Sequence, residues 1–182
     1  RYDQSGRRYT SYPSVAQFHP NITEEDYQRW STHSNEVTIP RALSLFFHIP
    51  FCDTVCFYCA CTKVVTKDHS KAARYLDYLG KEMELLGPLF DRDREVAQLH
   101  WGGGTPTFLN NDEIRRLMDM TRQHVSLLSD DSGEYSIEID PRSVDDLKLK
   151  VLREAGFNRI SLGVQDFNPD IQKAVNRIQD LT

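Results

Sequence analysis

Two spacings of hydrophobic positions recur along this chain, and each predicts one type of secondary structure. Short apolar runs predict strands at residues 42–49, 96–101, 134–140 and 159–165. Apolar residues three or four positions apart predict helices at residues 70–87, 110–128, 143–156 and 168–179. Each predicted strand is therefore followed by one predicted helix.

The first two of these helices each carry a single apolar stripe, which predicts the face that packs on the core. In the first helix the stripe consists of Ala72, Tyr75, Leu79, Met83 and Leu86. In the second helix it consists of Ile114, Leu117, Met118, Thr121 and Val125.

Polar residues and glycine mark several expected helix ends. Asn110 and Glu113 have the spacing of a capping box. Ser143 is the expected N-cap of the third helix, and Gly156 is its expected C-cap. Thr23 is the expected N-cap of a further short helix, at residues 23–30.

Four strand–helix repeats imply parallel strands joined by right-handed crossovers. An α/β barrel and a doubly wound sheet both satisfy this pattern. Four units do not close a barrel, so the pattern favours the first four β/α units of a larger barrel at residues 41–182. A polar, irregular arm at residues 1–40 precedes them.

Composition narrows the possible classes of protein. The chain is 39% hydrophobic and 27% charged, as is common for a globular protein, and its formal net charge is −5. This charge gives no reason to expect binding to nucleic acid or to an anionic membrane. No apolar run approaches the ~18 residues that a membrane span requires. No secretory signal is recognisable, and a start at Arg1 is typical of a fragment or a processed product.

All four cysteines lie within the ten residues of CDTVCFYCAC, at positions 52–61. Disulfides between thiols this close in sequence would form small, strained loops. The cysteines therefore indicate a reducing, cytoplasmic location and either metal or redox chemistry.

Residue chemistry favours an iron–sulfur cluster over zinc at this loop, without excluding zinc. Zinc commonly takes four ligands as two pairs well separated in sequence. A cubane cluster is larger, so three close thiolates, Cys52, Cys56 and Cys59, can each bind one corner. Cys61 follows too closely to reach the same cluster with good geometry. Three ligands would leave one iron open to a substrate or cofactor.

The strands end in further candidate residues, which parallel pairing would bring to one rim. Glycines 102–104 with Thr105 either offer backbone N–H groups to a carboxylate or phosphate, or form a tight turn, and the cysteine loop on the same rim favours binding. Glu138 needs a cationic partner, for which a ligand is favoured over a protein side chain. The remaining rim candidates are Asp140, Gln165 and Asp166.

Several other conspicuous residues are expected to have structural roles. His48 and His100 occur late in apolar strands and are expected to be hydrogen-bonded core histidines. Trp101 is expected to be a packing residue. For Arg7 and Arg8 in the arm, solvated surface charge is favoured over a role in binding an anionic ligand.

At this point the chain resembles a known family. CDTVCFYC followed by GGGTP is similar to the radical S-adenosylmethionine (SAM) enzymes. Cys61 and the segments RRYTSYPS, FFHIPFC, LHWGGGTPT, SIEIDPR and GFNRISLGVQDFN resemble, within that superfamily, the oxygen-independent coproporphyrinogen III oxidases (dehydrogenases) of haem biosynthesis. The resemblance covers essentially the whole chain. It implies an α/β fold, the N-terminal portion of a partial (β/α)6 TIM-like barrel.

The resemblance also implies cofactors and a reaction. Cys52, Cys56 and Cys59 would bind a [4Fe–4S] cluster, whose open iron binds SAM. Reductive cleavage of SAM would give a radical that abstracts hydrogen from a propionate of the tetrapyrrole. Two propionates of coproporphyrinogen III would lose carbon dioxide and become vinyl groups, giving protoporphyrinogen IX.

Further roles are carried over by motif match. A first SAM would contact Phe46, Tyr58 and Glu138. A second SAM would contact Gly103, Gly104, Thr105, Gln165 and Arg177. Cys61 matches a non-ligand cysteine associated with activity. The implied partners are the tetrapyrrole and an unidentified electron donor, and the full-length protein would be a monomer.

Departures from the family pattern leave alternatives open. Phe46 stands where tyrosine is usual, Tyr58 where phenylalanine is common, and Ala60 where glycine is usual. Later barrel strands and a C-terminal domain are absent, so this fragment alone is expected to be inactive or poorly active. The competing interpretations are a related haem chaperone, disfavoured by Cys61 and the arm, and a zinc-stabilised interaction module.

Overall fold

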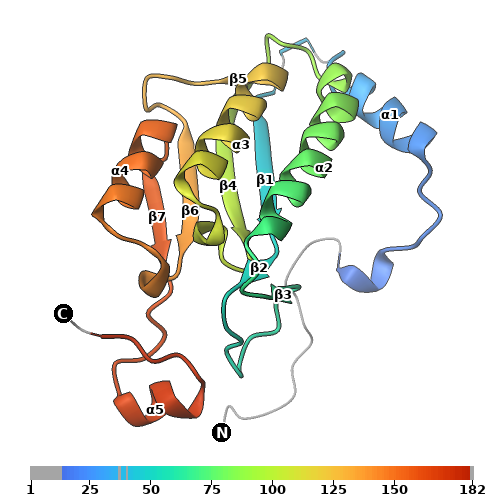
Figure 1. Ribbon diagram of the computed structural model, residues 1–182. Coiled ribbons are helices and arrows are strands. Elements are labelled where there is room, and N and C mark those ends of the chain that lie inside the picture. The colour runs from blue at the N-terminus through green and yellow to red at the C-terminus, as the bar shows by residue number, and fades with distance from the viewer. Residues whose placement is uncertain (1–13, 37, 40, 181–182) are drawn as a thin grey trace, which may run out of the picture.

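The computed structural model describes residues 14–36, 38–39 and 41–180, and its centre is a parallel sheet. The sheet order is β1-β4-β6-β7, and every pairing in it is parallel. A short strand, β5, also pairs with β4 (Figure 1). The strands are β1 (Leu43–Ile49), β4 (Glu95–Gly103), β5 (Ser126–Leu127), β6 (Glu134–Ile139) and β7 (Arg159–Leu162). The predicted α/β class with four parallel strands in chain order is confirmed.

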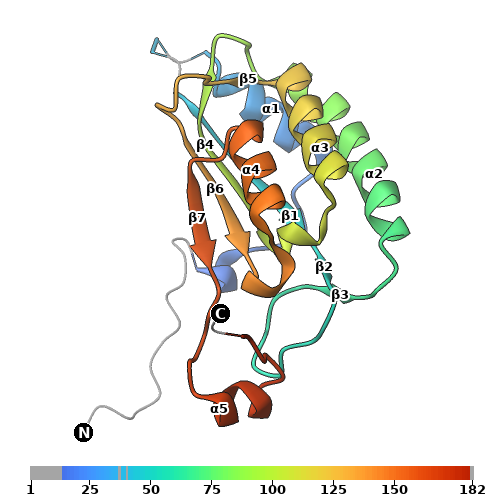
Figure 2. The same cartoon turned by 60° about the vertical axis from the view of Figure 1, so that its left-hand side comes forward.

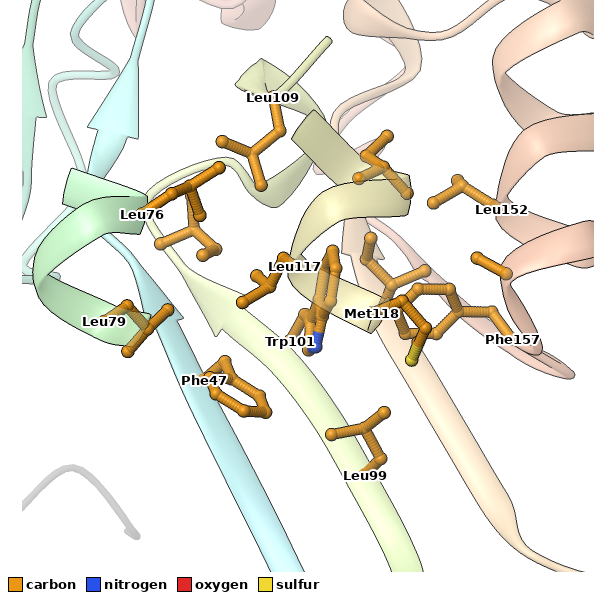
Figure 3. Packing of buried hydrophobic residues seen from close by; sticks show 14 of the residues in the cluster. Phe47, Leu76, Leu79, Leu99, Trp101, Leu109, Leu117, Met118, Leu152 and Phe157 are labelled. Atoms are coloured by element: carbon orange, nitrogen blue, oxygen red, sulfur yellow. The ribbon is translucent and has the colours of Figure 1, made fainter. Parts of the chain in front are cut away.

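Three helices cover one face of this sheet (Figure 2). They are α2 (Ser70–Leu86), α3 (Asn111–His124) and α4 (Asp146–Ala155). Between the helices and the sheet, Leu99 and Trp101 of β4 and Leu117 of α3 are completely buried (Figure 3). The core therefore lies between the helices and the sheet, and Trp101 is a packing residue, as predicted.

Further helices are α1 (Glu24–His33), beside α2, and short 3-10 helices (Figure 1). The helix α1 begins after Thr23, which forms a capping box with Asp26 and confirms the expected N-cap. The buried Arg94 ties the end of α1 to the sheet by donating to Ser34 Oγ and Asn35 Oδ1, both at 2.7 Å. The 3-10 helices are η1 (Val15–Gln17), η2 (Gly87–Leu89), η3 (Pro106–Phe108) and η4 (Pro141–Ser143).

Two small strands close the cysteine loop, and neither was predicted. These are β2 (Phe51–Cys52) and β3 (Val64–Val65), which pair in parallel. Beyond the carboxyl end of β7 lies a short helix, α5 (Pro169–Ala174), on the same side of the molecule as this loop (Figure 1).

The capping predictions were partly right. Asn110 and Glu113 form the expected capping box, and Gly156 ends α4 in the left-handed region, with φ 114°. Ser143 is not the N-cap of α4, because it lies in η4. Asp145 is the N-cap instead, since its carboxylate accepts from Lys148 N–H.

Several predicted elements were too long. The second helix ends at His124, because Val125 turns to extended backbone and leads into β5. The fourth strand ends at Leu162, before Gln165 takes a positive φ of 72°. The fourth helix ends at Ala174 rather than at residue 179. In α2 the predicted stripe omitted Leu76, which is completely buried, whereas the predicted Tyr75 and Leu86 are only half-buried.

Within the described part of the chain, no helix is both long and apolar enough to cross a membrane.

Candidate functional site at the carboxyl ends of the strands

A cavity of about 410 Å³ lies where the carboxyl ends of the strands meet the cysteine loop. Eleven of the twelve predicted site residues line it, although they come from segments more than 100 residues apart. They are Cys52, Cys56, Tyr58, Cys59, Cys61, Gly103, Gly104, Thr105, Glu138, Gln165 and Arg177. The predicted convergence on one rim is therefore confirmed for this set.

The cysteine loop presents its thiols at different depths. Cys52 and Cys56 are buried, Cys59 is half-buried and Cys61 is exposed. Burial raises the pKa of the Cys52 thiol, although Thr105 Oγ1 donates to its sulfur at 3.5 Å. The structure places Cys52 at the end of β2, so its backbone is held in a strand at the base of the loop.

Cys59 and Cys61 differ in the direction of their pKa shifts. Burial acts to raise the pKa of Cys59, but hydrogen bonds from Cys61 and the charge of Lys63 outweigh it, and the pKa is lowered. The pKa of Cys61 is raised, first by its hydrogen bond to Cys59 and then by burial. Lys63 Nζ also donates to the backbone oxygen of Cys59 at 2.8 Å. Cys59 is therefore the more acidic thiol of this pair.

Cys56 lies beside two guanidinium groups. Arg177 Nη1 is 3.5 Å from its sulfur, and Arg142 Nη2 is 3.9 Å away. Both arginines also bind the carboxylate of Asp140, which is 11% exposed, Arg177 at 3.1 Å and Arg142 at 2.7 Å. Burial alone would raise the pKa of Asp140, but hydrogen bonds from Arg142 and the charge of Arg177 lower it. Two cations thus share one anion and can also neutralise a thiolate at Cys56.

The glycine segment does not present free N–H groups to the cavity. Gly103 N–H donates to Glu138 Oε2 at 3.2 Å, Gly104 N–H to Ile49 O at 2.8 Å, and Thr105 N–H to Phe51 O at 2.8 Å. The interpretation of this segment as an amide cradle for a carboxylate or phosphate is therefore wrong.

Close packing explains the two glycines at the cavity instead. Gly103 has a φ of 114°, a region that residues with a Cβ adopt only with strain. At Gly104 an added Cβ would lie 2.7 Å from the carbonyl group of Pro50. These glycines allow β4 to pass directly beneath the start of the cysteine loop.

Glu138 has partners within the protein. Besides Gly103 N–H, His100 Nε2 lies 3.5 Å from its Oε1, and His100 Nδ1 lies 2.7 Å from Ser136 Oγ. Glu138 is nevertheless 47% exposed toward the cavity. One carboxylate oxygen therefore has a backbone donor, and the side chain remains accessible to a ligand.

Phe46 is the one predicted site residue that does not line the cavity. It lies on the face of the sheet opposite the helices, is 62% exposed and stacks on His100, with ring centroids 5.6 Å apart. His48 and His100 are half-buried on this same face, so their expected place in the core is wrong, although both are hydrogen-bonded. Alternation along a strand buried on only one face explains the error.

Two of the residues predicted at the rim, Gly102 and Asp166, do not line the cavity. Asp166 Oδ1 accepts from Asn168 N–H at 2.7 Å, which is a local turn contact. Arg7 and Arg8 lie outside the described residues.

Sequence reasoning missed two cationic residues of the cavity, Arg142 and Lys63. The spacing of Asp140 and Arg142, two residues apart around Pro141, was an available signal for the first. Lys63 follows Cys61 by two residues, which is close enough to reach the loop carbonyls.

The surroundings of the thiols fit thiolate ligands of a metal cluster. Among the residues the structure describes, no three His, Cys, Asp or Glu side chains lie close enough to hold one metal ion. The thiols instead face hydrogen-bond donors and cations, Thr105 at Cys52, Arg177 at Cys56 and Lys63 at Cys59. Such donors stabilise the sulfur ligands of iron–sulfur clusters.

Comparison with known proteins agrees with this arrangement. Residues 46–181 match the family described as the radical SAM superfamily. The chain is 53% identical over 179 residues to the oxygen-independent coproporphyrinogen III oxidase of Pseudomonas aeruginosa, covering 98% of this chain and 38% of that protein. A protein of the same name from Mannheimia haemolytica is 48% identical over 141 residues, covering 78% of this chain and 92% of the relative.

A solved structure also has this fold. The coproporphyrinogen III oxidase of Escherichia coli, described as a radical SAM enzyme, matches with a TM-score of 0.87 and 46% identity. The match covers 94% of this chain and 38% of that one. The chain thus spans less than half the length of most curated relatives it matches. It belongs to the radical SAM superfamily and, within it, to the family of oxygen-independent coproporphyrinogen III oxidases.

Proposed function

We propose that this chain forms the cluster-binding part of an enzyme that oxidatively decarboxylates coproporphyrinogen III. Two propionate side chains would become vinyl groups, and the product would be protoporphyrinogen IX. One observation carries the proposal: eleven of twelve residues assigned by motif line a single cavity at the carboxyl ends of the strands. A curated relative with the name of this activity is 53% identical over 179 residues of this chain.

Membership of the radical SAM superfamily implies a [4Fe–4S] cluster and SAM. We assign Cys52, Cys56 and Cys59 as the cluster ligands. When bound, the cluster and SAM supply a one-electron cleavage of the sulfonium bond and a radical that abstracts hydrogen from the substrate. Arg177 and Arg142 lie where they can stabilise the thiolate of Cys56.

Residues of this chain would then bind and orient two SAM molecules. Tyr58 and Glu138 would contact the first, where the accessible carboxylate of Glu138 suits a cationic amino group. Phe46 does not line this cavity, so its contact with the first SAM rests on the motif match alone; it would be a packing contact, because Phe46 has no hydroxyl group. Gly103, Gly104, Thr105, Gln165 and Arg177 would contact the second SAM. Cys61, which is exposed, would act in catalysis without binding iron.

The remaining partners follow from the same proposal. The substrate is a tetrapyrrole carrying propionates, and an electron donor reduces the cluster. The thiol-rich loop requires a reducing compartment, which the cytoplasm provides. We expect the full-length protein to act as a monomer, and this fragment alone to have little or no activity.

The decisive experiment replaces each cysteine by alanine in the full-length protein and reconstitutes it anaerobically with iron and sulfide. Wild type should take up about four irons per chain and absorb broadly near ~400 nm. Cys52→Ala, Cys56→Ala and Cys59→Ala should lose both signals, whereas Cys61→Ala should keep them but lose activity. Stoichiometric zinc without the absorbance would contradict the proposal.

Turnover separates the enzyme from a related haem chaperone. Incubation with SAM, a reductant and coproporphyrinogen III should release 5′-deoxyadenosine and protoporphyrinogen IX. Haem binding without decarboxylation would favour the chaperone instead.

A further inference from the structure

A three-residue segment after α5 contacts three consecutive residues of the cysteine loop. Two of these contacts join residues that are 121 positions apart in the sequence. We call residues 175–177 the clasp. Its contacts reach residues 55, 56 and 57, so they surround the middle cysteine on both sides. Phe57 N–H donates to Val175 O at 3.0 Å, Asn176 Nδ2 donates to Val55 O at 2.7 Å, and Arg177 Nη1 approaches Cys56 Sγ at 3.5 Å.

The backbone of the clasp is built to reverse the chain at this point. Asn176 has a φ of 56°, in the left-handed region, and its N–H donates to Lys173 O at 3.2 Å. Arg177 N–H donates to Gln172 O at 2.8 Å. These two bonds form a Schellman motif that ends α5, with Asn176 at the position where glycine is most common.

The choice of asparagine is informative, because glycine would suit this backbone better. Asparagine tolerates the left-handed region more readily than most residues with a side chain. Here its side-chain amide makes the bond to Val55 O, which glycine could not make. The residue thus combines a helix end with a contact to the loop.

Arg177 continues the clasp into the interior. It is only 8% exposed, and its Nε donates to Gly163 O at 3.0 Å. Its Nη1 contacts both Asp140 Oδ2 and Cys56 Sγ. The guanidinium is therefore held by Asp140, directly after β6, and by Gly163, directly after β7. It contacts Cys56 of the loop from this fixed position.

We infer that the clasp positions the cysteine loop around Cys56 before any cluster is bound, and that Asn176 is its positioning residue. This rests on the proposed function for the role of the loop, but not for the contacts themselves. Ordering a loop in advance removes conformational cost from a later binding step. Cluster assembly on this loop should therefore be faster and more complete with the clasp intact.

The test uses Asn176→Gly in the full-length protein, since glycine keeps the left-handed turn and removes only the bond to Val55. The Phe57 amide is the direct reporter, because its N–H is covered by Val175 O. In cluster-free protein we expect its hydrogen exchange to rise roughly tenfold, as loss of about one hydrogen bond implies. Exchange in β4 should stay unchanged, which a general loss of stability would not allow.

Asn176→Asp serves as a second variant, because aspartate has the same shape but cannot donate to a carbonyl when ionised. It should expose the Phe57 amide at least as much. Asn158→Gly is the control for loss of side-chain amide bonds away from the cavity: Asn158 Nδ2 donates to Gly133 O at 2.7 Å, and its Oδ1 accepts from Tyr135 N–H at 3.0 Å. It should leave both Phe57 exchange and cluster uptake at wild-type values.

Reconstitution with iron and sulfide gives the second readout. Asn176→Gly should take up iron several-fold more slowly than wild type and Asn158→Gly. Wild-type Phe57 exchange in both Asn176 variants would overturn the clasp, even if the cluster still forms. Raised exchange without iron uptake by any variant or by wild type would support the clasp and overturn the proposed function.

Discussion

The helix-covered core and the carboxyl-end cavity are held together by different forces. In the core, Leu99, Trp101 and Ile137 are completely buried, and the contacts are apolar. At the cavity, the buried Arg177 and Asp140, whose side chain is 11% exposed, are charged and bonded to each other. Apolar burial stabilises without regard to protonation, whereas ion pairs depend on the charge of both partners.

The stability of the two regions should therefore depend differently on pH, even where single substitutions in each region lower the free energy of unfolding by similar amounts. The difference between the regions also explains why the cavity is organised before any ligand is bound. Its cations and carboxylates already satisfy one another, and their positions are set by β6 and by the segment after β7.

The largest expected effect is that of Asp140→Asn. This change leaves the buried Arg177 without its carboxylate, and breaking a buried pair from one side costs about 3–5 kcal/mol. Urea denaturation at neutral pH should show this loss in the free energy of unfolding.

The stability lost in Asp140→Asn should depend on pH, because the Asp140 carboxylate titrates. The pKa of Asp140 is lowered in the folded protein, so its contribution is fully present above the unfolded value of about 3.9 and is lost as pH falls through the folded value. The difference between wild type and Asp140→Asn should therefore shrink as pH falls from about 5 toward 2. A constant difference would show that the ion pair is not the cause.

Leu99→Ala is the corresponding test in the core. Leu99 is fully buried on the helix-covered face, so the substitution should cost about 2–5 kcal/mol. Unlike the loss at Asp140, this cost should not vary between pH 5 and pH 3, because no titrating group is removed. Gln98→Ala, its exposed neighbour on the opposite face, is the control and should change stability by about 0.5 kcal/mol or less.

The sequence predicted most of the core because the core depends on local spacing. The positions Ala72, Leu79 and Met83 in α2 follow the helical period and are buried. Helix ends were predictable where the cap is a side chain with an unambiguous geometry, as at Asn110, or a glycine, as at Gly156. Ser143 failed as a cap because Asp145, two residues later, competes for the same role.

The cavity was predictable as a set of residues but not as a set of contacts. Parallel strand order alone brings Cys52, Gly103 and Glu138 to one rim. The partners of the thiols could not be predicted, because Arg177 and Cys56 meet across 121 positions through a turn after α5. Local spacing also did not predict that only one face of the sheet is buried. For this reason the histidines at positions 48 and 100 were wrongly expected in the core.

The smallest expected effect on stability, and the sharpest test of the cavity, is Glu138→Gln. Its side chain is 47% exposed, and glutamine can still accept from Gly103 N–H, so the free energy of unfolding should change by less than about 1 kcal/mol. Glu134→Gln is the matched control, because Glu134 lies on the same strand and face, is 45% exposed and pairs with Arg159.

Equilibrium binding of SAM to the cluster-loaded, full-length protein should separate the two variants. A charge-assisted hydrogen bond to the ligand amino group accounts for roughly tenfold in affinity, so only Glu138→Gln should weaken binding by that factor. Equal binding by both variants would remove Glu138 from the ligand contacts and leave it as a partner of His100 and Gly103 alone.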